Sequence, residues 1–167
     1  MVTPPLFEAS IFMAVKDAES NDLLNPATSG YIDAARIKLS YLNKDGEVKE
    51  AMYTAANPMD SYYGFGDLYF FYAHTLDGLI YNKERTSAVS TDYLTWPDGT
   101  VDTFECKYNT PGSSVLLEEV IVNGSLRWRW NDIIRDDGSV LMSSPYFLVT
   151  IDGDSRTISI LPYNLRP

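Results

Sequence analysis

Apolar and polar side chains alternate with a period of two along much of this chain, and this pattern constrains the fold more than any other feature. In residues 36–42, RIKLSYL, every second side chain is apolar, and about ten such runs follow one another at short intervals. Successive residues of a β-strand point to opposite faces of a sheet, so this period predicts strands with one buried face. Asp45-Gly46 and Asn123-Gly124 lie between adjacent runs, and such dipeptides favour hairpin turns because glycine adopts positive φ without steric cost. The rhythm is typical of an all-β sandwich or barrel.

Two aromatic-rich runs depart from clean alternation. Residues 6–15, LFEASIFMAV, predict one strand of about ten residues, although Phe12 and Ala14 blur its polar side. Residues 67–76, DLYFFYAHTL, are apolar almost without interruption. That composition predicts a strand that is covered on both of its faces.

The length and composition indicate one globular domain. The chain has 167 residues, of which 45% are hydrophobic and 22% charged, which is enough apolar content to bury a core without disulfides or metals. We therefore expect a single β-sandwich domain over residues 1–167. The net charge of −10 disfavours binding to nucleic acid and to anionic lipid headgroups, since both are negatively charged. The sequence contains no window of about 18 apolar residues, so we predict no membrane-spanning helix.

Few residues offer catalytic or metal chemistry. Cys106 is the only cysteine and His74 the only histidine, so neither an intrachain disulfide nor a cysteine-based zinc site can form. His74 lies three residues before Asp77, but no nucleophile motif such as GxSxG accompanies them, and we interpret His74 as a packing or surface residue. Glu118 and Glu119 are adjacent, so on a strand they point to opposite faces and cannot act as a glycosidase pair. We assign no catalytic residue and no cofactor.

The stretch WPDGTVDTFECKY, residues 96–108, concentrates the most chemical side chains. Asp98 and Asp102 are spaced loosely like calcium ligands, but the further ligands of an EF-hand loop are missing. Aspartate before glycine also favours a turn, and the following alternation places Asp102 and Cys106 on one face, with Cys106 as a small core residue. We interpret the stretch as a hairpin turn leading into a strand and predict no metal site. The clusters IDGDSR and RDDGS have the same turn interpretation, with a calcium ion bound at one of these loops as the alternative.

Aromatic side chains are plentiful, with 12 Tyr, 7 Phe and 3 Trp. Exposed aromatic rings can stack on sugars or anchor a protein partner. Tyr62, Tyr63 and Phe65 are the candidates for binding, because they lie in a loop with glycine and proline, where binding side chains are commonly displayed. Trp96, beside a turn proline, is the fourth candidate. The alternative is that these rings pack back onto their own strands. For Trp128 and Trp130, which share one face of residues 125–130, we expect burial in the core between the sheets, with Arg127 and Arg129 in solvent.

Three short motifs resemble segments of the small secreted lipoproteins of Bacteroides and related gut bacteria. Residues 21–26, NDLLNP, are similar to the "N-D-L-L-(N/D)-P" segment that those proteins place before a β-hairpin, although Glu19-Ser20 stands where they tend to have a residue and glycine. Residues 98–109 resemble their "DG-x-x-D-T-(I/F)" segment, and residues 120–124, VIVNG, resemble their "V-Y-x-N-G" hairpin. These motifs carry no catalytic residue.

The resemblance implies a β-rich domain that is exported, cleaved before a lipid-bearing cysteine and tethered in the cell envelope, at the outer membrane or in the periplasm. Met1 would then follow directly after the removed signal and tether. The first ten residues, MVTPPLFEAS, lack the basic region and long apolar core of a signal peptide. A cytosolic protein that begins at Met1 therefore stays open as another interpretation.

Together these observations predict an antiparallel two-sheet sandwich with Ig-like or jelly-roll-like connections and two long loops, at residues 17–34 and 54–66. The leading functional hypothesis is a non-enzymatic module that holds a glycan or another cell-envelope protein, or that has a structural role. Any membrane attachment would come from a lipid anchor outside this chain. The alternative is a hydrolase that acts on glycans or peptides with carboxylates from separate strands.

Overall fold

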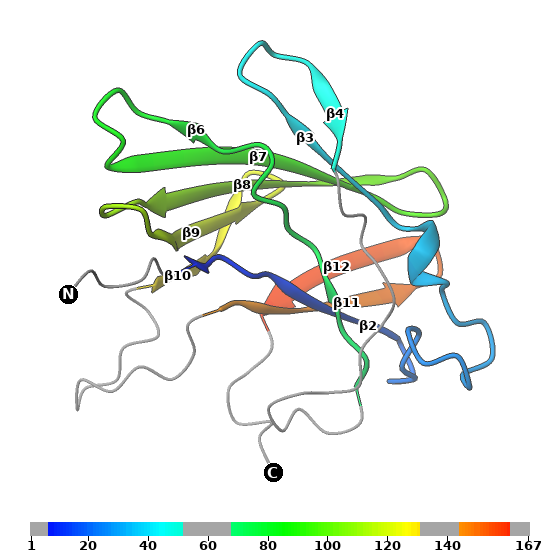
Figure 1. Ribbon diagram of the computed structural model, residues 1–167. Coiled ribbons are helices and arrows are strands. Elements are labelled where there is room, and N and C mark those ends of the chain that lie inside the picture. Colours follow the sequence, from blue (N-terminus) through cyan, green and yellow to red (C-terminus); the bar gives the residue numbers. More distant parts are fainter. Residues whose placement is uncertain (1–6, 52–67, 131–143, 161–167) are drawn as a thin grey trace, which may run out of the picture.

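The computed structural model describes residues 7–51, 68–130 and 144–160, and these segments form two facing β-sheets (Figure 1). The pairings are mostly antiparallel and neither sheet closes into a barrel, so the predicted all-β sandwich is confirmed. The described residues contain no α-helix, and the 3-10 helix η1 (Ala34–Arg36) is capped by the Asp33 side chain.

The larger sheet, sheet A, has the order β1-β9-β8-β7-β3-β4, with β10 also paired to β9 and β6 also paired to β7. Its strands are β1 (Phe7–Glu8), β3 (Lys38–Leu42), β4 (Val48–Glu50), β6 (Ile80–Tyr81), β7 (Ser87–Thr95), β8 (Val101–Asn109), β9 (Val115–Val122) and β10 (Ser125–Arg129). The β9–β10 turn is the predicted Asn123-Gly124 pair, in which both residues have positive φ, 50° and 84°. That backbone twist suits a tight hairpin.

The smaller sheet, sheet B, has the order β12-β11-β2-β5. Its strands are β2 (Phe12–Asp17), β5 (Phe71–Tyr72), β11 (Tyr146–Asp152) and β12 (Ser155–Ile160). The strand predicted over residues 6–15 is wrong in one respect: it is two strands in different sheets. β1 pairs in parallel with β9 of sheet A, and β2 pairs in parallel with β11 of sheet B.

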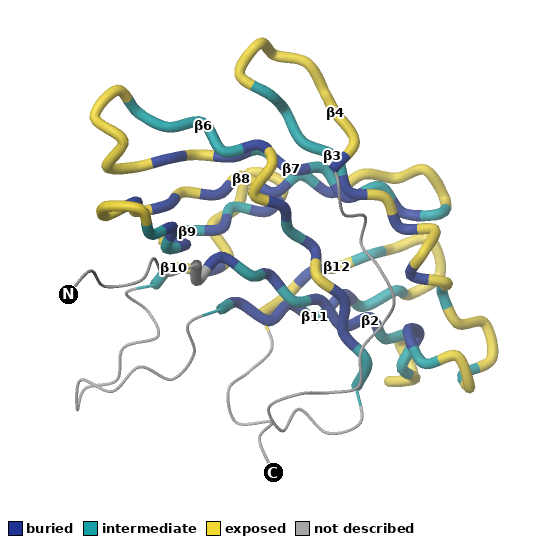
Figure 2. The backbone as a smooth tube through the Cα atoms, in the orientation of Figure 1, coloured by how far each residue is buried: buried dark blue, intermediate teal, exposed yellow. Residues whose placement is uncertain are grey.

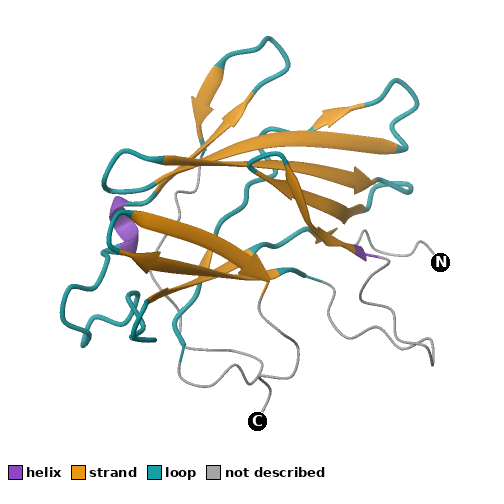
Figure 3. Cartoon of the chain, turned by 180° about the vertical axis from the view of Figure 1, so that it is seen from behind, coloured by secondary structure: helices purple, strands orange, loops and turns teal. Residues whose placement is uncertain are grey.

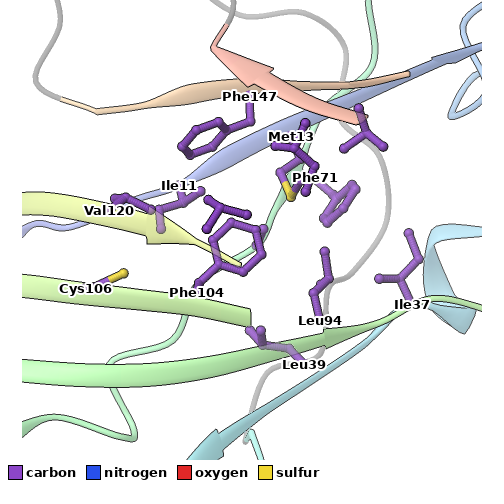
Figure 4. Packing of buried hydrophobic residues seen from close by; sticks show 14 of the residues in the cluster. Ile11, Met13, Ile37, Leu39, Phe71, Leu94, Phe104, Cys106, Val120 and Phe147 are labelled. Atoms are coloured by element: carbon purple, nitrogen blue, oxygen red, sulfur yellow. The ribbon is translucent and has the colours of Figure 1, made fainter. Parts of the chain in front are cut away.

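The hydrophobic core lies between the two sheets (Figures 2 and 4). Phe104 from sheet A and Phe147 from sheet B are both fully buried, and their rings meet edge to face with centroids 6.3 Å apart. The predicted alternation of β8 is confirmed, because Phe104, Cys106 and Tyr108 are all buried on its inner face. Burying each such side chain contributes about 1.5–3 kcal/mol.

Strand β2 is covered on both faces, which explains why its sequence alternates poorly. Met13 faces the main core, whereas Ala14 belongs to a second apolar cluster with Phe70 and Tyr146 on the other side of sheet B. Phe12 stacks on Tyr146 in this cluster, with ring centroids 4.5 Å apart. A strand that is buried on both faces reads as a continuous apolar run rather than an alternating one.

The strand predicted over residues 67–76 is mostly wrong, because Phe71 and Tyr72 are the described residues that pair there as β5. The chain then leaves sheet B and crosses to β6 of sheet A. Gly78 lies on this crossing, and a Cβ atom at its position would come within 2.9 Å of the Cβ atom of Tyr41. The crossing therefore packs closely against β3 and needs a residue without a side chain.

Candidate functional site

Two acidic hairpin turns, one from each sheet, lie at the same end of the sandwich (Figure 1). The β7–β8 turn, Trp96–Thr100, forms because the Asp98 carboxylate accepts hydrogen bonds from the Thr100 backbone N–H at 2.9 Å and its hydroxyl at 2.6 Å. Gly99 has a φ of 87°, which suits glycine. The β11–β12 turn joins the paired residues Asp152 and Ser155. Helix η1 lies beside both turns in the view from behind (Figure 3).

The carboxylate of Asp102 connects these turns. It is buried at the start of β8, with 5% of the residue exposed, and it accepts three hydrogen bonds from three different hairpins. The donors are the Trp96 indole N–H at 2.7 Å, the Arg156 Nε–H at 2.9 Å and the Asn123 amide at 2.9 Å. A buried charge is tolerated when it is paired and hydrogen-bonded in this way.

Arg156 lies near the start of β12 and bridges the two sheets. Besides its bond to Asp102, its Nη1 donates to the Thr100 hydroxyl at 2.6 Å. Its guanidinium carbon lies 5.1 Å from the centre of the Trp96 ring, within the range of a cation–π contact. The side chain is 15% exposed, so Arg156 is held from several sides and forms a rigid floor between the turns.

Between the turns is a pocket of about 200 Å³, which we call the turn pocket. Its walls combine aliphatic side chains with charged and hydroxyl groups. It is lined by Ile32, Trp96, Pro97, Asp98, Ile151, Gly153, Asp154, Ser155 and Arg156. Such a mixture of apolar walls and a few polar groups is typical of a ligand site.

The electrostatics of the turn pocket favour an ionised Asp98. Hydrogen bonds from the Thr100 hydroxyl and backbone N–H hold the pKa of Asp98 below its ordinary value of 3.8, and the positive charge of Arg156 lowers that pKa further. A glycosidase needs one carboxyl group with a raised pKa to act as the acid. Asp98 therefore fits the role of a hydrogen-bond acceptor better than that of a general acid.

A second polar cluster lies inside the sandwich and includes the single histidine. His74 Nδ1 lies 2.7 Å from Asp92 Oδ2, and His74 Nε2 lies 2.6 Å from the Tyr108 hydroxyl. The Tyr108 hydroxyl is in turn 2.8 Å from Ser90 Oγ. The sequence suggested Asp77 as the nearest carboxylate to His74, but the partner is Asp92 on β7, 18 residues away.

These four buried side chains are arranged in the order of a catalytic triad, except that a tyrosine lies between the serine and the histidine. A nucleophile has to reach its substrate, whereas the side chains of His74 and Asp92 are 3% and 0% exposed, and Ser90 and Tyr108 are buried. Burial also raises the pKa of the Tyr108 hydroxyl well above its ordinary value. The cluster therefore holds residues 73–79 against the inner face of sheet A, which agrees with the interpretation of His74 as a packing residue.

The structure places one of the four predicted binding residues. Tyr62, Tyr63 and Phe65 lie outside the described residues. Trp96 lines the turn pocket, but it is 3% exposed and its N–H is already bonded to Asp102. Little of its ring is available for stacking on a ligand, so the pocket offers its other walls for contact.

Sequence reasoning missed Arg156 and Asp154 as site residues. Both residues belong to the motif IDGDSR, whose pattern predicts only a turn. The signal that could have identified the site is the aspartate beside glycine, which occurs both in IDGDSR and in the WPDG turn. Within the described ranges, no group of three or more His, Cys, Asp or Glu side chains could hold a metal ion.

Comparison of the chain with protein-family models, with curated proteins and with solved structures finds no match. In the part of the chain that the structure describes, no helix has the length and apolar character needed to cross a membrane.

Proposed function

We propose that this protein is a non-catalytic binding domain of the cell envelope and that the turn pocket is its ligand site. The observation that carries this proposal is the built floor of the pocket, in which Asp102 holds Arg156 and Trp96 through hydrogen bonds of 2.9 and 2.7 Å. A site whose side chains are already fixed loses little conformational freedom when a ligand binds. Rigid placement of this kind supports a binding role.

The chemistry of the pocket supports binding over hydrolysis. Asp98 is an ionised acceptor, Arg156 has its charge paired with Asp102, and Ser155 has no histidine beside it among the residues that line the pocket. Hydrolysis by two carboxylates would require one of them to hold a proton near neutral pH. The partner in this proposal is a glycan or another protein of the envelope.

The envelope location is supported by the three motifs that resemble secreted lipoproteins. The coding sequence upstream of Met1 tests this part of the proposal. We expect it to encode a signal peptide followed by a lipid-attachment cysteine. An upstream stop codon with a ribosome-binding site directly before Met1 would overturn the envelope location and leave the binding proposal in place.

Chemical-shift mapping tests the binding site. The ¹⁵N-labelled protein is titrated with a panel of envelope glycans and with peptides from envelope proteins, and we expect the amide signals of residues 96–100 and 152–156 to move together. Ser155→Tyr, which fills the pocket, should abolish the shifts. The matched control is Ser113→Tyr, because Ser113 is also an exposed serine and lies in the β8–β9 turn. Binding that survives Ser155→Tyr, or no shift at these turns with any member of the panel, would contradict the proposal.

A further inference from the structure

We infer that the turn pocket takes the side chain of a lysine on a protein partner. This inference rests on the proposed function, because it names the ligand class of the same site. It follows from three properties of the pocket, which are its size, the nature of its apolar walls and the sign of its charge.

The size of the pocket favours a single side chain over a larger ligand. Pockets for drug-sized molecules occupy roughly 300–1,000 Å³, and the turn pocket occupies about 200 Å³. An oligosaccharide would leave most of its surface outside, whereas one extended side chain fits within the walls. A few side chains seated in pockets also carry most of the binding energy at protein interfaces.

The apolar walls fit a methylene stem better than a sugar ring. Sugars commonly stack on exposed aromatic faces, but the Trp96 ring is 3% exposed and Arg156 lies over it. The remaining apolar walls are the aliphatic side chains of Ile32, Pro97 and Ile151. A lysine buries its methylene groups along such surfaces and keeps its ammonium group at a polar end.

The charge of the pocket favours a cation. Arg156 is neutralised by Asp102 through a direct ion pair at 2.9 Å. The charges of Asp98 and Asp154 are not balanced in this way, so these two aspartates and the Asp102–Arg156 pair together carry a net charge of −2. Asp98 and Asp154 are both exposed. An anionic ligand would meet repulsion from both carboxylates, whereas a cation would be attracted by both. The net charge of −10 attracts cationic partners at longer range.

Lysine fits better than arginine for a steric reason. The ammonium group of lysine is a compact point charge, whereas the guanidinium of arginine is a wide planar fork. Arg156 already supplies one guanidinium to the floor of this small pocket. In a pocket of about 200 Å³ that already contains this guanidinium, we expect the compact ammonium group to be accommodated more easily than a second planar fork.

The experiment titrates the ¹⁵N-labelled full chain with three blocked tripeptides, acetyl-Gly-X-Gly-amide, in which X is lysine, norleucine or arginine. N-acetylglucosamine and its dimer are the sugar probes. We expect the lysine peptide to shift the amide signals of residues 96–100 and 152–156 and the norleucine peptide to leave them unchanged. Asp154→Asn and Asp98→Asn should each weaken lysine binding about two- to fivefold, as for an exposed ion pair. Ser113→Tyr, distant from the pocket, should leave the affinity unchanged.

The outcomes separate this inference from the proposed function. Shifts at both turns with a sugar or with the arginine peptide, and none with the lysine peptide, would overturn the lysine assignment while supporting the pocket as a binding site. Equal shifts with lysine and norleucine would overturn the electrostatic part of the inference. If no probe, including the panel of envelope glycans and peptides, shifts the amide signals of either turn, both the lysine assignment and the proposed binding site are overturned. Lysine binding that weakens as salt rises from 50 to 500 mM would support the ion pairing.

Discussion

Asp102 is the residue on which the turn pocket depends most, because one carboxylate organises donors from three hairpins. Its partners Trp96, Asn123 and Arg156 are 6, 21 and 54 residues away in the sequence. All three partners donate, so the site needs two acceptor oxygens and a negative charge. No other residue type supplies this combination in the same volume.

We predict that Asp102→Asn lowers the free energy of unfolding by about 2–4 kcal/mol, because the amide offers one acceptor oxygen and leaves Arg156 without its counter-charge. Urea unfolding followed by tryptophan fluorescence measures the change. Asp154→Asn is the matched control, since Asp154 is exposed and should change stability by less than about 0.5 kcal/mol. Equal effects of the two substitutions would show that the three hydrogen bonds contribute little.

The Tyr108 hydroxyl has a similar role in the buried cluster, where it lies between His74 and Ser90. We predict that Tyr108→Phe costs about 1–3 kcal/mol, because it leaves two buried polar atoms without their partner. Tyr31→Phe, at a tyrosine that is 47% exposed, is the control and should be near neutral.

The same cluster predicts the tautomer of His74. The ring nitrogen that faces the acceptor-only carboxylate of Asp92 is Nδ1, so we expect Nδ1 to carry a proton. The chain has one histidine, so a ¹⁵N imidazole spectrum of the folded protein reports on this ring without overlap. A spectrum of the Nε2–H tautomer would contradict the assigned geometry.

At the scale of elements, the β7–β8 turn links stability to pH through Asp98. The pKa of this carboxyl group is lowered in the folded state by Thr100, so its contribution to stability is fully present above its ordinary pKa of 3.8. That contribution is lost as the pH falls through the lower folded value. We predict that the wild type loses more stability than Asp98→Asn between pH 5 and pH 2. Unfolding by urea across this range measures the difference, and parallel curves would contradict it.

The strands and turns show which features of the fold can be predicted from neighbouring residues alone. The alternation in β8 and the Asp98-Gly99 and Asn123-Gly124 turns were predictable, because each depends on neighbouring residues. The change of sheet between β1 and β2 was not, because side-chain period says which face of a strand is buried and not which strand lies beside it.

The candidate site was predictable only in parts for the same reason. Each acidic turn was identified separately, but their meeting depends on the order of strands in both sheets. His74 illustrates the limit: proximity in sequence suggested Asp77, whereas strand geometry supplies Asp92. Arg156 carries no local sign of its role, since a polar residue beside a turn is ordinary on the surface of a sandwich.

For the whole molecule, Cys106 reports whether the two sheets stay closed. Burial between the sheets raises the pKa of its thiol well above the ordinary value, and the nearby Asp92 adds to this effect. The thiolate is the reactive form, so we predict that a thiol reagent at pH 8 labels the folded protein at least about 100-fold more slowly than the protein in 8 M urea. Rapid labelling without denaturant would show that the core opens around β8.

The parallel pairing of β2 with β11 joins two strands that are far apart in the sequence. Residues 12–17 find their partner in residues 146–152, more than a hundred residues further along the chain. Until this long-range pair forms, the apolar residues of β2 lack the strand that pairs with them, and unpaired strand edges promote aggregation. We therefore expect sheet B to form late in folding, because closing this long loop costs entropy before the pairing can offset it.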